Sequence, residues 1–135
     1  MSELNIKLIN ESTKEVAREL RNRNKGYFWD RKHITPSRHN KWFKHITTTQ
    51  NCFFYIIFLK DKPIGTVAWK LGRIGNAIID KPYRGQGYFK DVIKQVWKNH
   101  PGPSFVIVKK NNVGLQKMYK KLGFKMEMKA FMKLV

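Results

Sequence analysis

The sequence predicts an α/β (α+β) fold, in which a mixed central sheet carries helices on its faces. Apolar residues follow strand and helix spacings in turn, and the resulting element order is β-α-α-β-β-β-α-β-α-β. The chain has 135 residues, of which 41% are hydrophobic, and this is enough for one hydrophobic core. Because we find no internal repeat, linker or low-complexity tail, we treat residues 1–135 as a single domain.

The first third of the chain is expected to form one strand and two helices. Leu4 to Leu8 alternates apolar and polar residues, which is typical of a half-buried strand. Ser12 and Glu15 have the spacing of a capping box at the start of a helix that ends in the basic loop 21–26. Thr35 and the proline after it suit the start of a second helix, which runs to about residue 46.

The middle of the chain is expected to form three strands. Cys52–Leu59 is a β-rich apolar run, and Ile64–Trp69 returns as its hairpin partner after a turn at Asp61–Pro63. Leu71–Gly75 is then expected to form a short turn. The apolar residues Ala77–Ile79 make a strand that leads into a glycine-bearing segment.

The last third is expected to contain two helices and two strands. A helix from about residue 86 to residue 98 is followed by the chain-breaking segment Pro101–Pro103 and a buried strand, Phe105–Val108. A second helix opens at Asn111–Asn112 and ends at Leu122, with Gly123 as its C′ residue. Residues 126–135 alternate well enough to form a strand.

A large positive charge is the strongest compositional feature. The chain has 28 Lys and Arg against 9 Asp and Glu, which gives a net charge of +19. Such a field attracts anions, so nucleic acid, ribosomes, nucleotides or an acidic protein are candidate partners. The alternative is a solvated, lysine-rich surface without a partner, because the charge is spread along the chain and marks no single site.

The remaining composition points to a cytoplasmic protein without a membrane partner. No apolar run approaches the ~20 residues that span a bilayer, and the N-terminus lacks the pattern of a signal peptide. Cys52, which is the only cysteine, cannot form an internal disulfide, and this favours a reducing compartment. The histidines offer no convincing metal-ligand spacing, so we predict no metal site.

The segment Tyr83–Tyr88, here called the glycine loop, has the pattern of a phosphate-binding turn. It lies between the predicted strand 77–79 and a predicted helix. The first N–H groups of a helix have no partners within the helix, and glycines let a ligand approach the backbone closely. Arg84 adds a forked cation that suits phosphate. The pattern predicts a site for a phosphorylated cofactor.

Two segments together resemble the GNAT family of N-acetyltransferases. Arg84–Phe89 matches the first and fourth positions of the family's Q/R-x-x-G-x-G/A motif, although Phe89 stands where the family has a small residue. Asn112–Phe124 is similar to a second family segment, in which an Asn precedes a helix that bears a Tyr and ends in Leu-Gly-Phe. The spacing of seven residues between Asn112 and Tyr119 is that of the family.

The resemblance implies a GNAT-like fold, with a mostly antiparallel sheet and helices on both faces. It also implies acetyl-CoA as the cofactor, bound with its pyrophosphate at the amides of 84–89, and direct acetyl transfer to a primary amine. The cofactor-binding residues implied in this way are Ile79, Arg84, Gly85, Gln86, Gly87, Tyr88, Phe89, Asn112 and Tyr119. Asn112 has two expected roles, which are a hydrogen bond to the pantetheine arm and the cap of its own helix.

The resemblance assigns Tyr119 as the general acid that protonates the departing thiolate. The alternative is packing, because Tyr119 has helical spacing from its apolar neighbours. A base or a water chain must also take a proton from the amine. The sequence does not identify that base, and Asp80 is the candidate we select because it follows the strand that enters the glycine loop. Glu127 and the histidines near the second helix are weaker candidates.

The acceptor region is expected before the first hairpin strand, where basic and aromatic residues alternate. Trp29, Arg31 and His33 are the substrate-binding candidates, whereas Trp42 and Phe43 are favoured as core residues. This layout resembles family members that acetylate protein N-termini or nucleotide-linked amino sugars. The acceptor is then an amine carried by or near a polyanion, such as nucleic acid, aminoacyl-tRNA, a ribosomal protein or a nucleotide sugar.

Other functions remain open from the sequence. The protein is expected to be a monomer or a homodimer. The alternatives are transfer of another acyl group and a nucleic-acid-binding domain that keeps this fold without catalysis.

Overall fold

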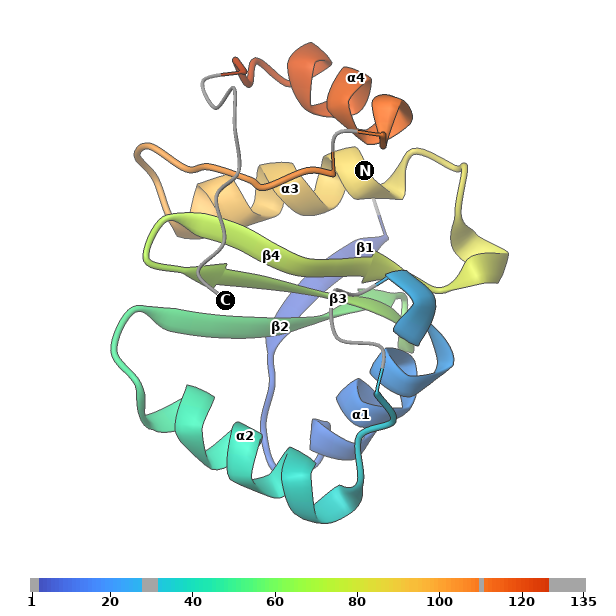
Figure 1. Cartoon of the computed structure of the whole chain (residues 1–135), viewed down its shortest axis with the longest axis vertical. Coiled ribbons are helices and arrows are strands. Elements are labelled where there is room, and N and C mark those ends of the chain that lie inside the picture. The colour runs from blue at the N-terminus through green and yellow to red at the C-terminus, as the bar shows by residue number, and fades with distance from the viewer. Residues whose placement is uncertain (1–2, 28–31, 110, 127–135) are drawn as a thin grey trace.

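The computed structural model describes residues 3–27, 32–109 and 111–126. Four strands form one antiparallel sheet in the order β1-β2-β3-β4 (Figure 1). The elements in chain order are β1 (Leu4–Leu8), α1 (Lys14–Arg23), the 3-10 turn η1 (Lys25–Tyr27), α2 (Pro36–Thr48), β2 (Cys52–Leu59), β3 (Lys62–Lys70), β4 (Arg73–Ile79), the 3-10 turn η2 (Lys81–Tyr83), α3 (Tyr88–Asn99) and α4 (Val113–Lys121).

Helices cover both faces of the sheet, which confirms the predicted fold class. In Figure 1, α1 and α2 lie against one face, whereas α3 and α4 lie on the other. The residues of β2 alternate between two cores: Tyr55 and Ile57 pack with α3, and Phe54 and Ile56 pack with α1 and α2. Burial on both faces explains why the sequence of β2 is a continuous apolar run.

Several predicted helix ends are confirmed by their hydrogen bonds. The side chain of Thr35 accepts a hydrogen bond from the Arg38 amide and caps α2. Gly123 has φ 102°, and its N–H donates to Lys120 O, while the Phe124 N–H donates to Tyr119 O. This pair of bonds is a Schellman motif, with Gly123 at C′ as expected.

The predicted capping box of α1 is wrong. Asn10 instead fixes the turn before this helix, whose N-cap residue Thr13 makes no side-chain capping bond: the Asn10 Oδ1 accepts hydrogen bonds from the backbone N–H of Ser12 and of Thr13, at 2.9 and 3.2 Å. Glu15 is paired with Arg18, so it does not reach back to the cap. The helix also continues through Arg23, so the first half of the predicted basic loop is its last turn.

Three boundaries around the hairpins also differ from the prediction. The β2–β3 turn comprises Lys60 and Asp61, and Pro63 lies within β3 next to a change of register, a place where proline is tolerated in a strand. The next turn is only Leu71–Gly72, because β4 already begins at Arg73. Helix α3 begins at Tyr88, two residues later than expected.

The predicted strand Phe105–Val108 forms only one bridge in the described residues. Phe105 pairs in parallel with Arg73, and the Ile74 amide donates to Phe105 O at 2.9 Å. The side chain of Phe105 is 52% exposed, so it is not a core residue. Of the last predicted strand, residues 127–135 lie outside the described part of the chain.

Gly65 allows β3 and β4 to approach closely beside the end of β4. A Cβ atom at this position would overlap the carbonyl oxygen of Ile78, a backbone atom that cannot move aside. Gly65→Ala is expected to lower the free energy of unfolding by about 1–3 kcal/mol. Gly26→Ala is the control, because a Cβ there meets no atom within 4 Å. Equal unfolding midpoints of the two variants in urea would contradict this role.

Candidate active site

The site is built around the connection from β4 to α3. The pairing of β4 with β3 shifts register just before the end of β4, because Thr66 pairs with Ile78 whereas Ala68 pairs with Gly75. The strand ends at Ile79, whose side chain is buried, and the Asp80 amide donates to Ile64 O at 2.7 Å. The turn η2 and the glycine loop then redirect the chain into α3 (Figure 1).

Two glycines of this loop adopt left-handed conformations. Gly85 has φ 77° and Gly87 has φ 81°, and in both cases the space that a Cβ would occupy has no atom within 4 Å. Gly87 is the N-cap of α3 and provides no side-chain hydrogen bond, in contrast to Thr35 of α2 and Asn112 of α4. The first amides of α3 therefore present N–H groups that the helix itself does not bond, and these fit an anionic group such as a pyrophosphate.

Arg84 is bonded back toward the protein from the start of this loop. Its Nε donates to the carbonyl oxygen of Ile79 at 2.7 Å, and its Nη2 donates to Oδ1 of Asn24 at 2.7 Å. The guanidinium thus closes the turn between β4 and α3 and joins it to the end of α1. Its direct contact with a phosphate, expected from the sequence, stays a prediction.

Asp80 lies in the same group of polar residues. Its Oδ1 accepts hydrogen bonds from Arg23 Nε at 3.1 Å and from Asn24 Nδ2 at 3.0 Å, and Arg23 Nη2 is 2.9 Å from Oδ2. Burial raises the pKa of this carboxyl, but the hydrogen bonds from Arg23 and Asn24 and the charge of Arg23 hold the pKa below its ordinary value of 3.8. A paired, ionised carboxylate is a weak base, and the predicted base role stays untested.

Tyr119 lies in the apolar contact between α3 and α4. Its side chain is 5% exposed, and burial raises the pKa of the phenol well above its ordinary value of 10.0. The ring meets Phe89 and Phe124 edge-on, with centroids 6.0 and 5.0 Å apart. The phenol keeps its proton at neutral pH, as a proton donor requires.

Phe89 packs into the core next to Tyr119. It joins the cluster of apolar residues that includes Val92 and Tyr119, so the departure from the family motif fills space between α3 and α4. The first turn of α3 therefore connects the glycine loop to the candidate acid through one aromatic contact.

Asn112 has the capping role that was one of its two expected functions. Its side-chain oxygen accepts a hydrogen bond from the Leu115 amide at 3.1 Å. The side-chain nitrogen carries two N–H donors, so capping does not prevent a hydrogen bond to the pantetheine arm. That second contact stays a prediction.

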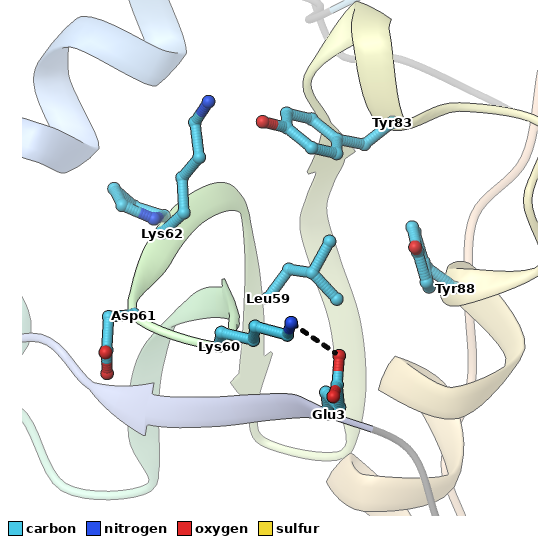
Figure 2. Close-up of a pocket in the computed structure, with 8 residues that line it drawn as sticks. Glu3, Leu59, Lys60, Asp61, Lys62, Tyr83 and Tyr88 are labelled. Carbon is cyan, nitrogen blue, oxygen red and sulfur yellow. Dashed lines mark ion pairs between the residues drawn. The ribbon is translucent and has the colours of Figure 1, made fainter.

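An open hollow of about 730 Å³ lies beside the glycine loop (Figure 2). Tyr83 from η2 and Tyr88 from α3 line it on one side, and the tip of the β2–β3 hairpin lines the other. Lys60 and Glu3, neighbours on its wall, form an ion pair of 3.6 Å. Tyr88 lines this hollow and also packs at the edge of the apolar cluster that Phe89 joins.

The acceptor candidates are only partly described. Trp29 and Arg31 lie outside the described residues, and His33 is exposed. Phe43 is buried and Trp42 meets Phe54 edge-on at 4.8 Å, so both are core residues as favoured.

Two asparagines at the end of α1 were missed by the sequence reasoning. Asn22 accepts from the Ile34 amide at 2.7 Å and donates to Ile34 O at 2.9 Å, which fixes the segment before α2. Asn24, only 5% exposed, contacts Asp80 and Arg84. The only sequence feature that could have indicated them is the repeated Arg-Asn pattern of residues 21–24, and this pattern is also typical of a solvated loop.

Within the described ranges, no three His, Cys, Asp or Glu side chains gather in a way that could hold a metal ion. None of the described helices is both long enough and apolar enough to cross a membrane.

The open helix terminus fits a phosphorylated ligand, and comparison with known proteins identifies the family. The sequence profile of the Acetyltransferase (GNAT) family matches residues 14–124. The chain belongs to this family. It is an acetyl-CoA-dependent N-acetyltransferase. A search of curated proteins gave no significant sequence match.

Solved structures share the fold at low sequence identity. An acetyltransferase from Thermus thermophilus is 14% identical, with a TM-score of 0.78 over 93% of this chain and 88% of that chain. A spermidine N-acetyltransferase from Vibrio cholerae, in complex with CoA and spermine, is also 14% identical, with a TM-score of 0.78 over 93% and 83%. A ribosomal L7/L12 alpha-N-protein acetyltransferase in complex with coenzyme A is 14% identical, with a TM-score of 0.77 over 93% and 81%.

Tyr119→Phe tests the proton-donor role. Because the phenylalanine keeps the ring packing, the free energy of unfolding should change by less than about 1 kcal/mol, whereas kcat should fall by about 10²-fold or more. Steady-state acetylation and urea unfolding measure the two quantities. Tyr83→Phe, which alters a tyrosine of the neighbouring hollow, is the control. Unchanged kcat in Tyr119→Phe would leave Tyr119 a packing residue.

Proposed function

We propose that the protein transfers the acetyl group of acetyl-CoA directly to a primary amine that is carried by or near a polyanion. The observation that carries the donor site is the open N-terminus of α3, where Gly85 and Gly87 expose backbone donors without a side-chain cap. The observation that carries the acceptor class is the net charge of +19.

The residues around the loop have complementary proposed roles. The amides of 84–89 and the positive end of the α3 dipole hold the pyrophosphate. Acetyl-CoA supplies an acetyl group that is activated as a thioester. Tyr119 holds a proton at its phenol oxygen for the sulfur as that atom gains charge, and Asn112 orients the pantetheine arm. Asp80 is the candidate that takes the amine proton, directly or through water.

The proposed acceptor residues are Trp29, Arg31 and His33, which lie in the sequence between α1 and α2. The structural neighbours act on or bind different amines, including spermine and a ribosomal protein. A field of +19 repels a polycation such as spermine and attracts anionic acceptors. Nucleic acid, aminoacyl-tRNA, a ribosomal protein on its RNA and a nucleotide sugar all satisfy this condition.

The alternative is a GNAT-fold protein that binds nucleic acid without catalysis or that uses another acyl donor. The same net charge supports it. The Asn112–Phe124 segment, with Tyr119 at the family's spacing, supports catalysis instead, and it lies within the residues that the family profile matches. We also propose a cytoplasmic location, on the basis of the single cysteine, and a monomer or homodimer.

Thiol release from acetyl-CoA tests this function with two acceptors of opposite charge, aminoacyl-tRNA and spermidine. We expect kcat/KM to be at least about tenfold higher for aminoacyl-tRNA, and to fall steeply between about 50 and 200 mM salt, because the attraction is screened. A sample without acceptor controls for hydrolysis. A higher kcat/KM for spermidine, or the absence of a salt effect, would contradict an acceptor carried by or near a polyanion. RNA binding without thiol release would support the nucleic-acid-binding alternative.

The pH dependence of the reaction tests the environment of Asp80. Because its pKa lies below 3.8, the carboxylate is ionised throughout about pH 5–9, and Asp80→Asn should leave the shape of the kcat profile unchanged there. A base role predicts a kcat loss of about 10²-fold, whereas a positioning role predicts mainly a higher KM for acetyl-CoA. The contradicting result is a kcat that falls toward acid between about pH 8 and 6 in the wild type but not in Asp80→Asn. It would show that the pKa of the Asp80 carboxyl is not lowered.

A further inference from the structure

Asn24 is the buried residue at which α1, the end of β4 and the glycine loop meet. It is the C-cap of α1 and is 5% exposed. Its Nδ2 donates to Leu20 O at 2.9 Å and to Asp80 Oδ1 at 3.0 Å, and its Oδ1 accepts from Arg84 Nη2 at 2.7 Å. We call Asn24, Asp80, Arg84 and Arg23 the Asn24 network.

These partners permit only one orientation of the Asn24 amide. Both N–H donors face oxygen acceptors, and the carbonyl oxygen faces a cation that can only donate. A rotation of the amide by half a turn would place its oxygen against two oxygens and its nitrogen against the guanidinium. The side chain is therefore fixed, and it holds Arg84 in a fixed position.

The position of Arg84 in turn determines the start of the glycine loop. The same guanidinium binds Ile79 O, so Arg84 joins both ends of the turn that leads from β4 into α3. Gly85 and Gly87 follow at once and have few steric restrictions of their own. Without a fixed Arg84, the backbone donors ahead of α3 would have to be ordered by the ligand, and this would weaken binding.

We propose that Asn24 is a positioning residue for the cofactor, which it does not itself contact: through Arg84 and Asp80 it orders the glycine loop before acetyl-CoA binds. The proposal rests on the proposed site for the cofactor at this loop. Arg23 completes the network, because its ion pair with Asp80 fixes the carboxylate that receives the Asn24 amide.

Asn22 supplies a matched control on the same helical turn. It also makes two hydrogen bonds from its amide, but both go to the backbone of Ile34 rather than to the glycine loop. Asn22→Ala and Asn24→Ala therefore remove the same group from the same helix end, and only Asn24→Ala breaks the contact with Arg84.

Calorimetric titration with CoA is the first test. We expect Asn24→Ala to raise the Kd of CoA about tenfold, and Asn22→Ala to leave it within about twofold. The double variant Asn24→Ala/Arg84→Met should bind no more weakly than Arg84→Met alone, because Asn24 acts through Arg84. Unchanged affinity in Asn24→Ala, or equal losses in both asparagine variants, would overturn the proposal.

Amide hydrogen exchange without ligand is the second test, and it separates this inference from the proposed function. Asn24→Ala should speed exchange in residues 81–87 relative to Asn22→Ala, and Arg84→Met should do the same if Asn24→Ala does not fold. Unchanged exchange in this segment would overturn the positioning role, whether or not CoA binds. A wild-type protein that binds no CoA would instead overturn the proposed cofactor site.

Discussion

The open N-terminus of α3 is the constraint on which the other features of the site depend. A helix that begins without a side-chain cap leaves its first N–H groups to a ligand or to water. Here the left-handed Gly87 occupies the cap position, whereas Thr35 and Asn112 cap α2 and α4 with side-chain oxygens. The chain must also turn sharply from β4 to reach this terminus, and Arg84 closes that turn.

The helix also couples the donor site to the rest of the molecule. Its apolar face packs on the sheet, and Gln95 bonds to the backbone of β1 at both its amide atoms. Its first turn carries Phe89 against Tyr119, so the candidate acid and the open amides belong to one packed unit. The high positive charge attracts anions from a distance, but these short contacts determine where a bound group can react.

The sequence predicted the fold class, most elements and the glycine loop, because periodic apolar residues and glycines are local signals. It misplaced the start of α1, because Asn10 binds the amides of Ser12 and Thr13 in a turn before the helix, and the N-cap falls at Thr13 rather than at Ser12. It also missed Asn24. The bonds from Asn24 to Asp80 and Arg84 cross more than fifty residues, and no local pattern reports such contacts.

The central claim is that the backbone donors ahead of α3 receive the phosphates of acetyl-CoA. Amide chemical shifts during a titration of the labelled protein with CoA test it most directly. We expect saturable shifts to be largest at the amides of residues 85–89, with a pronounced change for Gly87. Binding that moves the amides of another region and leaves residues 85–89 unchanged, or no binding to the folded protein, would contradict it.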